Sequence, residues 1–315
     1  MRELRQLKQV DSELKQKSGR RNSIVPIIGE PLHADLENFV VVRLPLVKRN
    51  GRLCAEILKL SDLHYGHTDQ RRSFLQRYLN LAQKNPHIRL QILGDLFEMQ
   101  NLAPFLKEAE DPESKQIQAF LDDFEAVKKQ LNIIILGNHD LRFAKASSKA
   151  IDLVEYLKLK LGSLNIFSVE PGRGVLAAYR VGKQIYTDYM LHGASNATVN
   201  YMTQLRRAAL NFHTDIVSMG HNHKLASEPY THYTIAKVGG KLCRLIYRTY
   251  LISCGCFLGY PAYAEERSAP INDVGAYLIR LYADRPGIEI VDTRIAFHTQ
   301  LYTKNGTIKI EEDKK

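Results

Sequence analysis

Hydrophobic positions follow two different periods along this chain. In four segments apolar side chains recur every three or four positions, which predicts amphipathic helices. These helices are expected at residues 71–83, 113–131, around 150–161 and 198–211. Short apolar runs between them predict buried strands. These strands are expected at residues 57–60, 90–93, 133–136 and 215–219. The alternation of strand and helix is typical of an α/β fold.

Two further regions are predicted to be strands. From about residue 229 the chain is rich in Tyr, Ile and Val, so the C-terminal third is expected to be mostly β. Near the start of the pattern, residues 39–42 and 52–60 flank Asn50-Gly51. That dipeptide favours a two-residue hairpin turn, so the two runs are expected to pair as a hairpin.

Charge and spacing divide the chain into three parts. Residues 1–21 hold seven Lys or Arg against three acids, with Leu and Val at helical spacing. We therefore expect residues 1–37 to form a basic helix and a linker, a surface element able to contact phosphates. Residues 38–300 are expected to form one domain, and residues 301–315 a charged tail.

Composition narrows the class of protein only in part. The 315 residues include 44 Lys or Arg and 34 Asp or Glu, a net charge of +10, which favours polyanionic partners. No window approaches a membrane span, and the N-terminus has no apolar signal segment. The four cysteines form no C-x-x-C pair. A reduced, cytoplasmic protein is the expectation.

The chemistry is concentrated in five short polar blocks, each placed after an apolar strand. The blocks are Ser61 to His67, Gly94 to Glu98, Gly137 to Asp140, Leu191 to Gly193 and Gly220 to His223. Ligands of open α/β sheets gather at the carboxyl ends of the strands. All five blocks are therefore expected to converge on one crevice.

The side chains of these blocks form a consistent set of metal ligands. They offer carboxylates, an amide oxygen and imidazoles, a mixture that suits Mn, Fe, Co or Zn better than Ca or Mg. The donors are Asp62, His64, Asp95, Asn138, His192, His221 and His223. If one carboxylate bridges, seven donors make eight bonds, or four protein ligands for each of two ions. Open positions then remain for water and substrate.

The order D-x-H, G-D-x-x-E, G-N-H-D, H-G and G-H-x-H resembles the calcineurin-like metallophosphoesterase superfamily over about residues 57–225. The resemblance implies a four-layer α/β/β/α sandwich with a dimetal site at the strand ends. It also implies two ligand sets that share Asp95. These sets are Asp62, His64, Asp95 and His223, and Asp95, Asn138, His192 and His221.

The same resemblance implies a reaction, hydrolysis of a phosphoester by in-line attack of a metal-bridging hydroxide. His139 is expected near the substrate as general acid or phosphate ligand, with Asp140 orienting it. Arg142 is a candidate clamp for a phosphate oxygen, with a surface salt bridge as the alternative. Two divalent ions are the expected cofactors, Mn before Fe, Co or Zn.

Departures from known branches limit the choice of substrate. The Ser/Thr protein phosphatases of this superfamily carry an Arg-Gly pair after the second block, which is absent here. The repair nucleases place a histidine where this chain has Glu98, and the lipid A pathway pyrophosphatase has Arg at the position of His139. Residues 254–260 and 263–265 resemble a branch that bacteria and their phages encode, largely without assigned substrates.

A phosphodiester in a nucleic acid or nucleotide is the favoured substrate, with DNA or RNA as the expected partner. Residues 224–250 support it, since basic residues alternate there with tyrosines, although a twisted hairpin with a solvated face explains the same pattern. A phosphomonoesterase or pyrophosphatase on a nucleotide or lipid headgroup is the alternative. A non-catalytic scaffold is the second alternative. Membrane-surface contact through the basic helix is not favoured, and the sequence leaves the oligomeric state open.

Overall fold

The computed structural model describes residues 38–99, 113–141, 153–162, 165–169, 172–193, 201–238, 241–259 and 271–293. The expected basic helix within residues 1–37, the charged tail 301–315 and Arg142 lie outside these ranges. The three-part division of the chain therefore stays a prediction.

Two β-sheets form the centre of the molecule. One has seven strands in the order β13-β12-β3-β4-β5-β6, with β2 beside β3. Its strands are β2 (Val47–Arg49), β3 (Arg52–Leu60), β4 (Arg89–Leu93), β5 (Leu131–Ile135), β6 (Asn165–Phe167), β12 (Tyr277–Tyr282) and β13 (Ile288–Asp292). The other has six, in the order β1-β7-β8-β9-β11-β10. Its strands are β1 (Phe39–Arg43), β7 (Gly174–Val181), β8 (Gln184–Leu191), β9 (Ile216–Met219), β10 (Leu225–Val238) and β11 (Lys241–Cys254).

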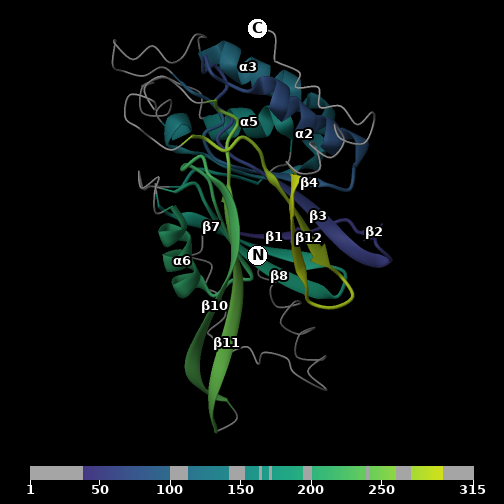
Figure 1. The fold of residues 1–315 in the computed structure, drawn as a ribbon. Coiled ribbons are helices and arrows are strands. Elements are labelled where there is room, and N and C mark those ends of the chain that lie inside the picture. The colour runs from purple at the N-terminus through teal and green to yellow at the C-terminus, as the bar shows by residue number, and fades with distance from the viewer. Residues whose placement is uncertain are drawn as a thin grey trace, which may run out of the picture.

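Helices cover the outer face of each sheet, as Figure 1 shows. Over the seven-stranded sheet lie α2 (Arg72–Lys84), α3 (Glu113–Phe124), the 3₁₀ turn η1 (Glu125–Gln130) and α5 (Leu153–Leu161). The six-stranded sheet is covered by α6 (Tyr201–Phe212). A third core lies between the two sheets and is built from their facing side chains. The four-layer α/β/β/α architecture is thus confirmed, and so is the β-rich C-terminal third.

The helices and strands form where the hydrophobic periods predict them, with shifts at their ends. The largest shift is in 113–131, where the α-helix ends at Phe124 and continues as η1 before β5 begins at Leu131. β5 is buried on both faces because helices cover one side of its sheet and the second sheet covers the other. No helix within the described ranges is long and apolar enough to span a membrane.

The predicted hairpin at Asn50-Gly51 exists, but one of its strands was wrong. Both turn residues have positive φ angles, 47° and 80°, as a two-residue hairpin turn requires. The strand that pairs with β3 across this turn is the short β2. β1 instead lies in the other sheet, parallel to β7. The turn signal identified the hairpin, whereas the upstream apolar run belongs to a long-range pairing.

A group of buried polar side chains joins the two sheets, and we call it the inter-sheet network. Lys59 of β3 donates to Asp188 of β8 at 2.5 Å, and both side chains are fully buried. Tyr179 and Ser218 also donate to Asp188, and Gln91 donates to the Tyr179 hydroxyl. This network holds β3 and β8, which lead directly into two of the polar blocks, at a fixed separation.

Candidate metal centre

The five polar blocks converge as the sequence predicts. β3, β4 and β5 are parallel neighbours in one sheet, and β8 and β9 are parallel neighbours in the other. Their carboxyl ends therefore lie at the same edge of the molecule. The first two loops are bonded to each other, since the Asp62 amide donates to the Gly94 carbonyl at 3.0 Å and the Leu63 amide to the Asp95 carbonyl at 2.8 Å.

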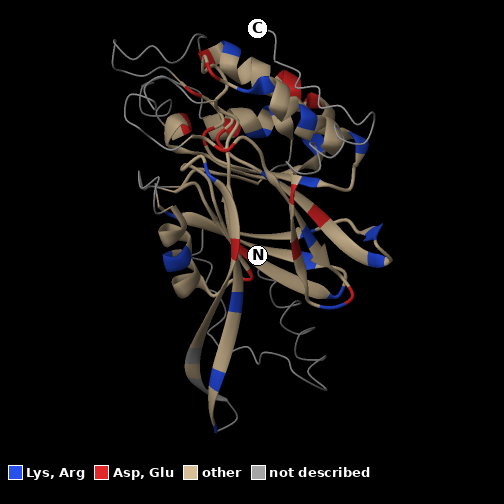
Figure 2. Ribbon diagram, in the orientation of Figure 1, with Lys and Arg blue, Asp and Glu red and all other residues tan. Residues whose placement is uncertain are grey.

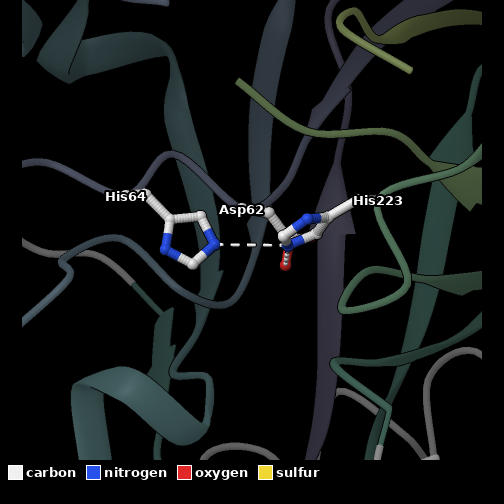
Figure 3. A group of neighbouring side chains, drawn as sticks. All are labelled: Asp62, His64 and His223. Atoms are coloured by element: carbon white, nitrogen blue, oxygen red, sulfur yellow. Dashed lines mark hydrogen bonds and ion pairs between the residues drawn. The ribbon is translucent and has the colours of Figure 1, made fainter. Parts of the chain in front are cut away.

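Three of the expected ligands, Asp62, His64 and His223, form one group, drawn in Figure 3. The Nε2 atoms of His64 and His223 face each other at 3.3 Å, and His223 Nε2 lies 3.3 Å from Asp62 Oδ1. Asp62 is anchored by the Ser61 hydroxyl and by the His221 amide, 2.9 Å from Oδ2. Two imidazole nitrogens and a carboxylate oxygen pointing at one spot can hold a cation.

The remaining four expected ligands lie together around Asp95. Asp95, His192 and His221 form a second group of possible ligand atoms. His192 Nε2 is 3.1 Å from Asp95 Oδ2 and 3.0 Å from the Asn138 amide oxygen. Its other ring nitrogen contacts the Leu93 carbonyl at 2.7 Å, which fixes the ring orientation. All seven expected ligands are therefore brought to this edge.

Glu98 links this centre to His139, a role that the sequence analysis did not give it. Its Oε2 contacts His64 Nδ1 at 2.7 Å, and its Oε1 lies 3.2 Å from His139 Nδ1. The three side chains form a third group of possible ligand atoms. Glu98 is the last residue of the second polar block, so the block itself was the available signal. Its contact with two histidines depends on loop conformation, which spacing does not show.

Asp140 contacts the backbone of the ligand loops. Its carboxylate accepts hydrogen bonds from the amides of Gly137 at 2.8 Å, Phe97 at 3.0 Å and Leu96 at 3.2 Å. Burial, with Asp95 nearby, raises the pKa of Asp140 to about 7. The carboxylate beside the His139 imidazole is that of Glu98. Asp140 thus ties the second block to the third, and its expected effect on His139 stays a prediction.

The backbone of the centre is unusual for residues with side chains. Five of the seven expected ligands have φ angles of 47° to 70°, in the left-handed region. They are Asp62, His64, Asp95, His221 and His223. Such a conformation costs about 1 kcal/mol or more per residue and persists where surrounding structure enforces it. Backbone strain at the residues whose side chains converge indicates a functional site.

Two glycines are required because ligand atoms lie where their side chains would be. A Cβ at Gly137 would overlap the Asp95 carboxylate and its backbone nitrogen. A Cβ at Gly220 would overlap the Ser61 hydroxyl and lie 2.8 Å from Asp62 Oδ2. The Gly-Asn-His-Asp and Gly-His-x-His spacings therefore have a steric cause.

Buried charge in the centre calls for a compensating cation. Burial raises the pKa of Asp62 and Asp95, but hydrogen bonds and charge from His223 and His192 outweigh it and leave both pKa values lowered. Burial and the nearby His192 lower the pKa of His221 to about 4, so this ring is neutral at pH 7. Burial lowers the pKa of His192, but Asp95 outweighs it and raises the pKa to about 10, so this ring carries a proton that a divalent ion would displace. The carboxylates and the neutral His221 are already in the protonation states that metal ligands require, so the donor set fits divalent ions.

A shallow depression adjoins the second group. It is lined by Asn138 and His192, by apolar side chains including Leu141 and Val169, and by Arg173. Arg173 thus supplies a positive charge beside the centre, the role that the sequence analysis gave to Arg142.

Cys254 and Cys256 are buried free thiols. They lie at the start of the segment from residue 254 to 265, whose role the sequence leaves unassigned.

The chain matches one known family and resembles several solved structures. The model of the family described as calcineurin-like phosphoesterase matches residues 55–237, more than half of the chain. No curated protein matches it. Vacuolar Protein Sorting 29 from Cryptosporidium parvum aligns at 16% identity and a TM-score of 0.39, over 76% of this chain and 91% of its own. Wild-type Vps29 of Entamoeba histolytica complexed with zinc aligns at 16% identity and a TM-score of 0.35, over 75% and 98%.

Proposed function

The chain belongs to the calcineurin-like phosphoesterase family, and on that premise we propose that it is a metal-dependent phosphodiesterase acting on a nucleic acid or nucleotide. One observation carries the proposal. Two groups of ligand atoms, from four loops far apart in the sequence, lie together at one edge of the molecule, and Asn138 of a fifth loop contacts His192 of the second group. Such a set matches a two-ion hydrolytic centre.

In this proposal Asp62, His64 and His223 hold one divalent ion, and Asn138, His192 and His221 hold the other, with Asp95 shared between them. Manganese is the proposed metal because mixed oxygen and imidazole ligands suit it, with Fe, Co and Zn as the other members of that class. The bound ions would supply an acidified water near neutral pH and neutralise charge on the phosphate oxygens.

The chain's own residues then position the substrate and move a proton. The His139 amide donates to Asp95 Oδ1 at 2.9 Å, so the backbone of the third loop is fixed relative to the shared ligand. Glu98 contacts His139 Nδ1 and orients the ring, which leaves Nε2 to donate a proton to the leaving oxygen. Arg173 and, by sequence, Arg142 are the proposed contacts for a phosphate oxygen.

A diester is proposed rather than a monoester because the basic charge of the chain suits a polyanion. The net charge is +10, and basic residues continue into the segment after the last ligands. A reducing, cytoplasmic location belongs to the same proposal, supported by four cysteines that are all free thiols.

The test compares hydrolysis of bis-(p-nitrophenyl) phosphate with hydrolysis of p-nitrophenyl phosphate. The protein is stripped with chelator and refilled with Mn²⁺, then compared with Asp95→Asn and His139→Ala. We expect metal-dependent diester cleavage that falls by about 10³-fold in Asp95→Asn, because the shared carboxylate is lost. Asp284→Asn is the matched control, since its carboxylate is partly exposed and pairs with Arg52.

Each other result has a defined meaning. Cleavage of the monoester alone would replace the diester by a phosphomonoesterase or pyrophosphatase reaction. No turnover with Mn, Fe, Co or Zn, together with no bound metal, would overturn the enzyme and favour a binding scaffold.

A further inference from the structure

The two longest strands of the molecule, β10 and β11, extend beyond the sheet to which they belong. β11 pairs with β9 only over Tyr250–Ser253, whereas β10 and β11 stay paired out to Val238 and Lys241. Among the described residues, no other strand lies beside the outer part, residues 230–238 and 241–249, which we call the ribbon. Figure 1 shows it passing α6 and pointing away from α2, α3 and α5.

The ribbon has one face packed on the body and one face open. Residues directly opposite each other in an antiparallel pair lie on the same face. His232 is opposite Tyr247, and on this face His213, just after α6, bonds His232 at 2.8 Å and stacks on Tyr247. The body thus braces this face of the ribbon at His232 and Tyr247, and the opposite face is open to solvent.

The open face combines apolar and basic side chains. The large apolar residues Tyr233, Ile235, Leu242 and Ile246 are 67%, 69%, 80% and 56% exposed. Arg244, between Leu242 and Ile246, and Arg248, next to Ile246 on the same face, are exposed. They lie over the rings of Tyr233 and Tyr250 at 5.7 and 5.4 Å. The sequence from residue 229 to 250 contains no Asp or Glu. Figure 2 shows basic and no acidic positions along the described outer ribbon.

We infer that the open face of the ribbon binds a nucleic acid, an inference that rests on the proposed phosphodiesterase function and names how its substrate is held. The arginines would neutralise phosphates, and Tyr233 with the aliphatic side chains would contact sugars and bases. A polyanion is the expected partner because the open face presents arginines and residues 229–250 contain no Asp or Glu.

The order of residues on the open face disfavours a bilayer or a second copy. Arg244 lies between Leu242 and Ile246 along the same face, so inserting those aliphatic side chains into lipid would carry its guanidinium with them. Two copies of this face would bring arginines against arginines, which is repulsive. Nucleic acid accepts both kinds of side chain at once.

The ribbon is also placed to hold a long substrate. β10 begins two residues after His223, and Ile235, opposite Arg244, lies ten residues along it. At ~3.3 Å per residue Arg244 is roughly 33 Å from the ligand loops. That distance corresponds to about 10 base steps at 3.4 Å each. Arg248, opposite Thr231, lies only six residues along β10, so substrates of about six nucleotides are expected to reach it, and only those longer than about 10 nucleotides to reach Arg244.

The experiment measures binding without turnover. Fluorescence anisotropy of a labelled 30-nucleotide DNA strand and of its duplex is followed in EDTA, with full-length Asp95→Asn protein as the parent. Adding both Arg244→Glu and Arg248→Glu to this parent is expected to weaken binding of the single strand, the duplex or both by about tenfold or more. The slope of log affinity against log salt should fall by roughly 1.5. Arg77→Glu with Lys84→Glu on α2 is the matched control, with the same charge change far from the ribbon.

Several results would overturn the inference. The first is that the ribbon variant and its parent bind DNA equally well. The second is that the α2 control weakens binding as much as the ribbon variant does, because that would show an effect of net charge alone. A dimer that becomes a monomer in the ribbon variant would indicate a second copy as the partner. Loss of binding to phosphatidylglycerol vesicles with DNA binding unchanged would indicate lipid.

Failure of the proposed function is separately visible in the protein with its native ligands. Ribbon-dependent DNA binding without hydrolysis of any diester would leave the ribbon inference standing and overturn the phosphodiesterase. Metal-dependent hydrolysis of bis-(p-nitrophenyl) phosphate by the protein with Asp95 intact, together with DNA binding that the ribbon substitutions leave unchanged, would do the reverse.

Discussion

The inter-sheet network and the candidate metal centre are both buried and polar, yet they are organised in opposite ways. Lys59 and Asp188 meet within regular strands; Tyr179 donates to the same Asp188 oxygen as Lys59, and Ser218 donates to the other oxygen. In the candidate metal centre five of the seven expected ligands have left-handed backbone conformations in loops, and imidazole nitrogens face one another.

This difference separates structural from functional buried charge. The inter-sheet network balances its own charge and has an ordinary backbone, so it can stabilise the fold without a ligand. The metal centre concentrates acceptor atoms that only a cation satisfies together, and the surrounding fold enforces the strain. Burial of polar groups alone therefore does not identify a functional site. Acceptor atoms that lack a balancing cation and lie on strained backbone do identify one.

The largest expected effect comes from breaking the balanced network. Lys59→Met leaves a buried carboxylate without its cation, so the free energy of unfolding should fall by about 3–5 kcal/mol. Urea unfolding followed by circular dichroism in EDTA measures it. The double variant Lys59→Met with Asp188→Leu should recover most of the loss, because neither charge remains. A loss below about 1 kcal/mol in the single variant would show that the network does not hold the sheets.

The metal centre should respond to ions where the inter-sheet network does not. Mn²⁺ at 100 times its dissociation constant should raise the free energy of unfolding by about 2.7 kcal/mol, because it binds the folded chain alone. Asp95→Asn should abolish that increase, whereas Lys59→Met should keep it on a lower baseline. Thermal unfolding with and without Mn²⁺ checks both. An increase retained in Asp95→Asn would place the ions elsewhere.

The sequence predicts the seven ligands because each lies in a contiguous block after a strand, and strand ends must meet at a sheet edge. It does not predict the contact of Glu98 with both His64 and His139, which depends on how two loops fold against each other. The pairing of β1 with β7 was missed for a similar reason, since a turn signal reports only local partners. The extent of the ribbon also depends on where β9 begins, since Ile216 is its first residue paired with β11.

The smallest expected effect tests whether Glu98 orients the two histidines it contacts or only fills space beside the metal centre. Glu98→Gln keeps the shape of the side chain and removes the charge that orients His64 and His139, so kcat should fall by about 10- to 100-fold, or roughly 1.4–2.7 kcal/mol in barrier.

Burial raises the pKa of Glu98, but the hydrogen bonds from His139 and His64 outweigh it and hold the pKa well below its usual range. The carboxylate is thus ionised throughout neutral pH, so titration of Glu98 itself adds no pH dependence to the loss between about pH 5 and 9. Glu289→Gln is the matched control, since that carboxylate pairs with Arg280 on the surface. A rate within twofold of the parent would show that Glu98 fills space without orienting either histidine.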